Sequence, residues 1–224
     1  MRRFARENSL SLFFALLFLG ALVGQAFAGL AEYNNEQLAS HFAVVSMGEY
    51  VTSADFAVDV VENWQSEYLQ FLLYIFVTVW LVQRGSPESK EVDRRGPESD
   101  RQQKVGVYAE ESSPRLATLG GIATGLYSRS LGIVMCVLFL ASWLAQSIAG
   151  WAAFNEQRMS QLQDPLPWVG YVTSADFWSR SLQNWQSEFL AIGSMAVLSI
   201  YLRQRGSPES KPTGAAHEST GVSG

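Results

Sequence analysis

The chain has 224 residues, of which 48% are hydrophobic, and a formal net charge of −5. Its apolar residues gather into four long runs separated by charged segments, which argues against one or two soluble domains. Basic and acidic residues are concentrated in different segments, so the net charge of the chain does not indicate a nucleic-acid partner. The single cysteine, Cys136, excludes an internal disulfide.

The first apolar run follows three N-terminal arginines and ends at Ala26–Gly29, which resembles a secretory signal with a small-residue cleavage site. The same run recurs in mid-chain, where no signal peptide is expected: Gln25 and Gly29 have counterparts in Gln146 and Gly150. We therefore expect the first run to be a retained membrane helix.

Three segments of the chain occur twice without change, at one constant offset of 121 residues. They are Tyr50–Phe56 and Tyr171–Phe177, Asn63–Glu67 and Asn184–Glu188, and Gln83–Lys90 and Gln204–Lys211. The chain is therefore interpreted as two copies of one sequence unit. The apolar runs have drifted between the copies, so the unchanged segments are positions that both copies need.

Each apolar run, with the helical pattern beside it, reaches about 20 residues, which is enough to cross a hydrocarbon core of roughly 30 Å. Four transmembrane helices are predicted, at about 9–30, 64–83, 130–151 and 185–203. Of the 16 Lys and Arg residues, all but Arg158 and Arg180 lie at 1–8, 84–129 and 203–224. The positive-inside rule then places both termini and the central segment in the cytoplasm.

The predicted fold class is an all-α membrane protein whose four transmembrane helices form two parallel two-helix repeats. Its regions are repeat 1 at 1–90, a cytoplasmic linker at 91–128, repeat 2 at 129–211 and a tail at 212–224. The linker and the tail are rich in Gly, Ser and charged residues, so we expect the linker to be largely disordered and the tail to be disordered. A short surface helix within 104–128 remains open.

The repeated segments predict the start, depth and end of the second helix of each copy. A hydroxyl can cap its N-terminus, a tryptophan can anchor it at the outer interface, and a glycine followed by proline can stop it. These roles are assigned to Ser53 and Ser174, to Trp64 and Trp185, and to Gly85 and Gly206.

The predicted start, depth and end of these helices do not account for two further repeated residues, Glu67 and Glu188. Counting about 20 residues along each helix places them just inside the outer membrane face, level with Gln25 and Gln146. One interpretation is a cation or proton site, or a polar vestibule, because ionisable groups at membrane depth are costly. The other, which we favour, is hydrogen bonding between helices at the water boundary. No catalytic, cofactor-binding or metal-ligating motif is present, so neither an enzyme nor a cofactor is predicted.

Several of these motifs together resemble an uncharacterised family of small bacterial membrane proteins, domain of unknown function 6766, in two tandem copies. They are the arginine-rich start, Gln25–Gly29, Tyr33–Gln37, Asn63–Glu67 and Gln83–Lys90. The resemblance covers nearly the whole chain outside the linker and tail. It implies a bacterial cytoplasmic (inner) membrane location, and no activity or functional residue.

The function predicted first is a structural or interaction role in the membrane, such as an accessory subunit. Acidic outer loops and a flexible linker would face partners, which are the lipid bilayer, other membrane proteins or a second copy of the chain. The alternative is a small dimeric transporter or channel that uses the polar cluster near the outer face, since four helices rarely enclose a pore alone.

Overall fold

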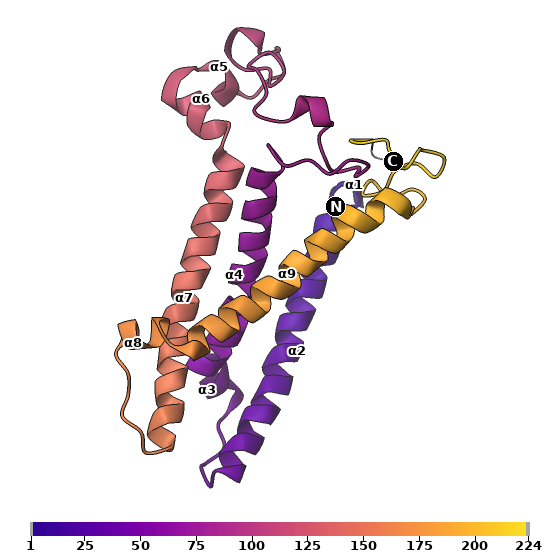
Figure 1. Cartoon of the computed structure of the whole chain (residues 1–224). Coiled ribbons are helices and arrows are strands. Elements are labelled where there is room, and N and C mark those ends of the chain that lie inside the picture. Colours follow the sequence, from indigo (N-terminus) through magenta and orange to yellow (C-terminus); the bar gives the residue numbers. More distant parts are fainter. Residues whose placement is uncertain (1, 223–224) are drawn as a thin grey trace. The chain divides into compact units, whose positions relative to one another are not determined.

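A computed structural model describes residues 2–222, and every regular element in this range is helical (Figure 1). The all-α prediction is confirmed. The longer helices are α2 (Ser9–Ala39), α4 (Ala54–Val77), α7 (Ser130–Ser160) and α9 (Ala175–Tyr201). The shorter elements are α1 (Arg2–Glu7), α3 (Met47–Val51), η1 (Val92–Arg94), η2 (Gly106–Tyr108), α5 (Arg115–Thr118), α6 (Gly121–Tyr127) and α8 (Trp168–Val172).

The chain divides into two compact units, and the divisions fall inside α4, α7 and α8. The first unit holds the described residues up to Val60 together with Gln146–Tyr171. The second holds Val61–Ala145 and the residues from Val172 on. Each unit therefore draws on both halves of the sequence.

The helices α2 and α7 are each 31 residues long, about 46 Å at 1.5 Å per residue. Both continue nine residues past the predicted ends at 30 and 151. The added residues include Glu, Gln, Leu and Ala, which are good helix formers, and contain no Gly or Pro. The first part of each predicted outer loop is therefore helical.

Both helices end in the same geometry within the first unit. The N–H of Phe42 donates to the carbonyl of Gln37 and that of Gln163 to the carbonyl of Arg158, each at 2.8 Å. The residue before each donor has a positive φ, 63° at His41 and 57° at Leu162. This geometry is typical of a helix C-terminus that ends with a residue in the left-handed backbone conformation. The geometry thus repeats even where the two copies differ in sequence.

Serine hydroxyls lie at the N-termini of α4 and α9. Ser53 Oγ accepts a hydrogen bond from the N–H of Phe56 at 3.2 Å, and Ser174 Oγ accepts one from the N–H of Phe177 at 3.3 Å. Each bond satisfies an N–H that the first turn of a helix leaves without a partner.

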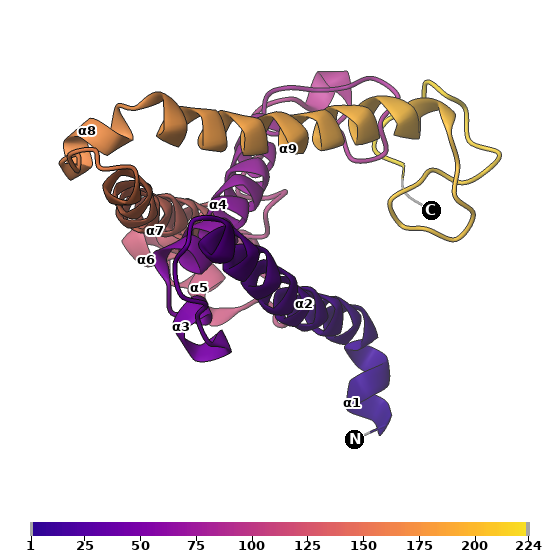
Figure 2. The same ribbon diagram turned by 90° about the horizontal axis from the view of Figure 1, so that it is seen from below.

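The C-termini of α4 and α9 differ from the predicted ends at 83 and 203. The helix α4 ends at Val77, where the Thr78 hydroxyl bonds back to a carbonyl of the preceding turn, that of Tyr74, at 2.6 Å. The helix α9 ends at Tyr201 and is uninterrupted up to there (Figure 2). The Arg203 guanidinium then donates to the carbonyl of Ile200 at 3.0 Å. A basic side chain at this position satisfies a terminal carbonyl.

Among the helices of residues 2–222, α2 and α7 are long and apolar enough to cross a membrane, and α4 and α9 do not meet this criterion. The prediction of four such helices is corrected to two. The reason is the polar segment that both helices contain, Asn63–Glu67 in α4 and Asn184–Glu188 in α9, which leaves too short an apolar stretch after it. None of the apolar stretch of α2 is buried.

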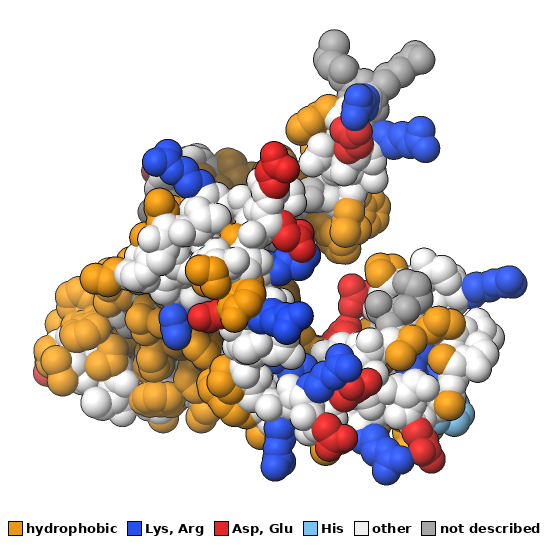
Figure 3. All heavy atoms as spheres, turned by 90° about the horizontal axis from the view of Figure 1, so that it is seen from above, with side chains coloured by type: hydrophobic (Ala, Val, Ile, Leu, Met, Phe, Trp, Pro, Cys, Tyr) orange, Lys and Arg blue, Asp and Glu red, His pale blue; other side chains and the backbone are white. Residues whose placement is uncertain are grey.

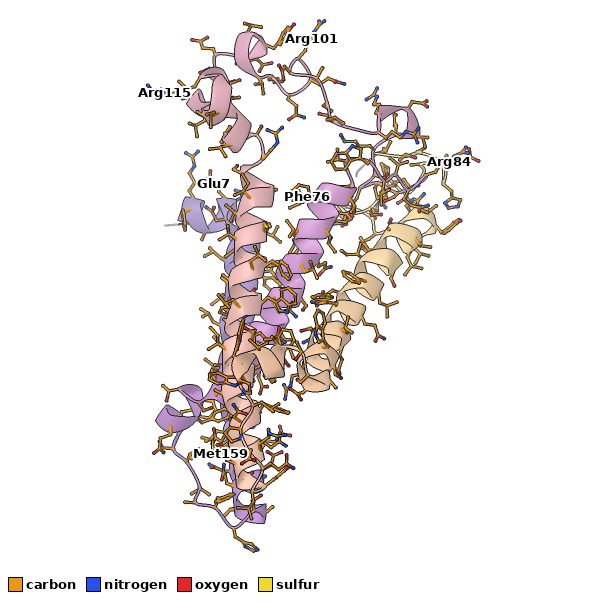
Figure 4. The ribbon with its side chains drawn as sticks, turned by 60° about the vertical axis from the view of Figure 1, so that its left-hand side comes forward. Glu7, Phe76, Arg84, Arg101, Arg115 and Met159 are labelled. Carbon is orange, nitrogen blue, oxygen red and sulfur yellow. The ribbon has the colours of Figure 1, made fainter. Side chains whose placement is uncertain are left out.

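The linker, which is predicted to be largely disordered, contains short helical elements. Besides its two 3-10 turns it holds α5 and α6, which are joined by the buried Thr124. The Thr124 hydroxyl accepts from the N–H of Gly120 and donates to the carbonyl of Leu116, both at 2.8 Å. Charged side chains are interspersed over the surface seen in Figure 3, and Figure 4 labels Arg101 and Arg115 of this segment.

The tail follows a path of turns up to residue 222, while residues 223 and 224 lie outside the described range. Its predicted disorder stays a prediction. In the same unit α4 packs against α7 through Phe76, labelled in Figure 4. A Cβ added to Gly132 would lie 3.2 Å from the Phe76 ring, so the glycine permits this close contact.

Candidate functional site

The four polar residues predicted near the outer face are divided between the two units. Gln25 is half-buried on α2 and Gln146 is fully buried on α7, both in the first unit. Glu67 is exposed on α4 and Glu188 is half-buried on α9, both in the second unit. The pairing of each glutamine with a glutamate therefore stays a prediction.

The second unit brings the two repeated glutamates together. The Glu188 carboxyl lies near Ser66 and close enough to Glu67 for the two charges to repel. The Ser66 hydroxyl itself donates to the carbonyl of Asn63 at 2.9 Å. Ser66 is buried. Two neighbouring carboxylates beside a buried hydroxyl favour the binding of a cation or the sharing of a proton. Within residues 2–222 no group of three or more His, Cys, Asp or Glu side chains could hold a metal ion.

Beside the glutamates, Trp185 connects α9 to α4. Its indole Nε1 donates to the side-chain carbonyl of Gln65 at 2.8 Å, and Gln65 is fully buried. One turn away Arg180 forms an ion pair with Glu62 at 3.2 Å. Trp185, predicted as an interface anchor, therefore also contacts the other helix, whereas Trp64 is 40% exposed.

An aromatic cluster, which the repeats did not predict, packs beside these contacts in the second unit. Trp143 stacks on Phe139 and Phe177 with ring centroids 5.5 and 6.1 Å apart, and it also contacts Trp178 and Trp185. Positions 143 and 178 correspond to Leu22 and Ala57 in the first copy. The sequence signal that could have indicated this cluster is the larger number of tryptophans in the second copy.

In the first unit the repeated tyrosines lie against the repeated glycines. A Cβ added to Gly29 would lie 2.1 Å from the Tyr50 hydroxyl, and one added to Gly150 would lie 2.3 Å from the Tyr171 hydroxyl. Both tyrosines are buried, Tyr171 completely. Each tyrosine thus fixes a short helix, α3 or α8, against a long one at a point where only glycine fits.

Two asparagines hold the outer loops of the first unit in place. Asn34 accepts from the N–H of Val45 at 2.7 Å and donates to its carbonyl at 3.0 Å. Asn155 makes the same pair of bonds to Leu166, at 2.8 and 2.9 Å. Asn34 and Asn155 match between the copies, but Val45 and Leu166 do not, because the bonds are to backbone atoms.

The segments Gln83–Lys90 and Gln204–Lys211, called here loop A and loop B, share one internal frame. The N–H of Gln83 donates to Ser89 Oγ at 2.8 Å, and the N–H of Gln204 donates to Ser210 Oγ at 2.9 Å. Gly85 and Gly206 have φ of 88° and 83°, which favours glycine. Both glycines lie in these loops beyond the ends of α4 and α9, so they do not cap the helices as predicted.

Lys211, the last residue of loop B, is only 1% exposed. Its Nζ lies within hydrogen-bonding distance of four carbonyls, those of Gly85, Ala216, His217 and Ser219, at 2.6, 3.3, 2.8 and 3.2 Å. An ammonium has three N–H groups, so one of them is shared between two of these carbonyls. Burial, with a smaller contribution from Arg203, lowers the pKa of Lys211. The ammonium thus joins loop A to the turns of the tail.

Among known protein families, the family described as Domain of unknown function (DUF6766) matches residues 1–222 as a single domain. The expected two tandem copies of the family domain are thus corrected to one domain that contains the internal repeats. No curated protein and no solved structure matches the chain.

Proposed function

The chain belongs to the DUF6766 family, whose function is unknown, and we propose that it is a multi-pass membrane protein that serves as a scaffold or accessory subunit for other membrane proteins. Its location is the cytoplasmic (inner) membrane of a bacterium, as the motifs it shares with that family suggest. Both termini and the linker face the cytoplasm, where the basic residues lie.

Exposed apolar side chains along α2 support the membrane location. Phe13, Phe14 and Leu17 are 56, 59 and 53% exposed, and the helix is long enough to span the hydrocarbon core. A contiguous apolar surface of this kind needs lipid or a partner to cover it. The proposed topology needs two further crossings, which we assign to α4 and α9 together with the residues that flank them, because their apolar second halves alone are too short to span the hydrocarbon core.

The structural contacts of the residues that both copies retain support the scaffold role. The tyrosines, glycines and asparagines that both copies retain hold α3, α8 and their loops in fixed positions. The loops so held expose apolar side chains, among them Val44 at 56%, Leu162 at 97% and Val169 at 64%. A rigid surface with exposed apolar residues is typical of a docking site for another protein. This retained outer geometry is the observation that carries the proposal.

Site-specific photo-crosslinking in native membranes tests this role. A photoreactive residue at Val44 or Leu162 is expected to give a discrete protein adduct, which mass spectrometry then identifies. The same residue at Gln103, an exposed linker position on the proposed cytoplasmic side, serves as the control. If Val44 and Leu162 yield lipid adducts alone, the scaffold role is wrong. A reporter fused after residue 224 that is active only outside the membrane would contradict the topology.

Transport is a second candidate, which the proximity of Glu67 and Glu188 favours. If these carboxyls bind a translocated cation or proton, the Glu67→Gln and Glu188→Gln variants should abolish ion flux into reconstituted vesicles. The Glu62→Gln variant is the matched control, because Glu62 is ion-paired on the same helix. Flux that is unchanged in the double variant would exclude this candidate and leave the scaffold role standing.

A further inference from the structure

The two short helices of the linker, α5 and α6, are called here the helix pair and carry their large apolar side chains on the outside. The buried residues of the helix pair are small, Ala117 and Thr124. Its exposed apolar residues are Leu116, Leu119, Ile122 and Leu126. The most exposed of them is Ile122, at 82%. Side chains of this kind are normally turned away from water, so their exposure indicates that another surface covers them.

The backbone of the helix pair fixes this outward arrangement. Gly120 and Gly121, between the two helices, have φ of 73° and 59°, a conformation that favours glycine. The Thr124 hydroxyl joins the helices through its bonds to Gly120 and Leu116, both at 2.8 Å. The apolar side chains are therefore held outside by the turn itself.

The covering surface is indicated by the helix that follows. The helix α6 ends at Tyr127 and α7 begins at Ser130 (Figure 1). Since α7 is long and apolar enough to cross a membrane, its first residues lie at the boundary between lipid and water. Leu126 precedes Ser130 by four residues, about 6 Å of helix rise. The helix pair thus lies next to the lipid headgroups.

The charges of this segment are suited to an anionic membrane surface. No Asp or Glu occurs between Glu111 and Glu156, whereas Arg115 and Arg129 flank the helix pair. Both arginines are exposed, and within residues 2–222 neither forms an ion pair. By contrast, Lys104 in the preceding part of the linker is paired with Glu110 at 2.9 Å. Positive charge without a protein partner beside exposed apolar residues favours anionic lipid.

A short helix also precedes the apolar helix of the first copy. The offset of 121 residues aligns α1 with α6 and the following residue. In α1 the ring of Phe4 is 63% exposed, and Arg3 and Arg6 stand beside it in the sequence. Both copies therefore place exposed apolar and basic side chains just before a helix that can cross the membrane.

We propose that the helix pair is a membrane-surface anchor that binds anionic phospholipid headgroups of the cytoplasmic leaflet. Its apolar side chains insert at the boundary between headgroups and acyl chains, and Arg115 and Arg129 bind the lipid phosphates. The anchor fixes the second half of the linker at the start of α7. It rests on the membrane crossing of α7 and does not depend on the scaffold role.

Quenching of a fluorophore by labelled lipid tests the anchor. The full chain with Cys136→Ser and Ile122→Cys carries the fluorophore in nanodiscs of phosphatidylcholine, with or without phosphatidylglycerol. A nitroxide near the headgroup should quench the label at 122, and more strongly with phosphatidylglycerol. The matched control is Val107→Cys, since Val107 is also apolar, lies in the same linker and is 92% exposed. Its label should stay unquenched.

A label on α7 separates failure of the anchor from failure of the membrane location. Val134→Cys, at an exposed position of α7, should be quenched by a nitroxide on the lipid acyl chain. If the label at 134 is quenched and the label at 122 is not, the anchor alone is wrong. If neither is quenched, the membrane crossing of α7 is wrong and the anchor with it.

Exchange of one arginine tests the recognition of the headgroup. With phosphatidylglycerol present, Arg115→Gln should lower the ratio of docked to free label at 122 about fivefold, the weight of one basic residue near an anionic surface. Arg101→Gln is the control, because Arg101 is an exposed cation outside the helix pair; both arginines are labelled in Figure 4. Equal effects of the two variants, or quenching at 122 that does not depend on phosphatidylglycerol, would contradict headgroup binding.

Discussion

Gly150→Ala should lower the free energy of unfolding by about 1–3 kcal/mol, the usual cost of overpacking a well-packed site. The new methyl group would lie 2.3 Å from the Tyr171 hydroxyl and 3.0 Å from Cζ of its ring. Tyr171 is fully buried and its ring also contacts Phe154, so it cannot move away without displacing α8. The measurement is thermal unfolding of the purified protein in lipid nanodiscs.

Gly24→Ala is the control for this substitution. It too lies inside a long helix, but a Cβ there meets no atom within 4 Å. The same replacement should therefore stabilise the protein by up to about 0.5–1 kcal/mol, because alanine favours the helix. Opposite signs for one chemical change would identify the tyrosine contact as the cause. Adding Tyr171→Phe to Gly150→Ala should recover part of the loss, whereas equal stability of Gly24→Ala and Gly150→Ala would contradict the close contact.

Asn155→Asp should destabilise the protein by about 1–3 kcal/mol near neutral pH, and the loss should shrink on acidification. A carboxylate still accepts from the N–H of Leu166, but it cannot donate to the carbonyl, which it repels instead. The protonated acid restores that donor, so the folded state raises the pKa of the new carboxyl above about 3.9. Stability should thus approach that of the wild type as the pH falls towards that value and decline as it rises.

The measurement compares unfolding midpoints at about pH 4.5 and about pH 8, on either side of the expected titration. The control is Asn35→Asp, an exposed neighbour of the equivalent Asn34, which should show little change at either pH. A loss in Asn155→Asp that does not depend on pH would mean that the paired bonds to Leu166 are not what the asparagine contributes.

The repeats predicted the helical class and assigned serines to the first turns of α4 and α9, because capping depends on three or four consecutive residues. The prediction of a helix end from a glycine and a nearby proline was less successful. Gly85 followed by Pro87 looks like a helix stop, yet α4 ends at Val77. The glycine instead takes a positive φ inside loop A, which the hydroxyl of Ser89 holds.

The contacts that the repeats did not predict join residues distant in the sequence. The glycines and tyrosines of the first unit were recognised as repeated, but their contact depends on the path of an intervening loop. The buried position of Lys211 depends on carbonyls of both loop A and a tail whose composition resembles that of disordered chains. Asn34 and Asn155 could have been identified, since polar residues retained in both copies at the end of an apolar helix indicate a loop contact.

The bond from Lys211 to the carbonyl of Gly85 also has a consequence for the order of events during synthesis. Donor and acceptor are 126 residues apart, so at about 5–20 residues per second loop A must wait roughly 6–25 s for its partner. Throughout that time its backbone groups are open to chaperones, proteases and neighbouring nascent chains. The contact can form only after Lys211 has left the ribosome, so loop A stays without this partner while the second copy of the repeat is synthesised.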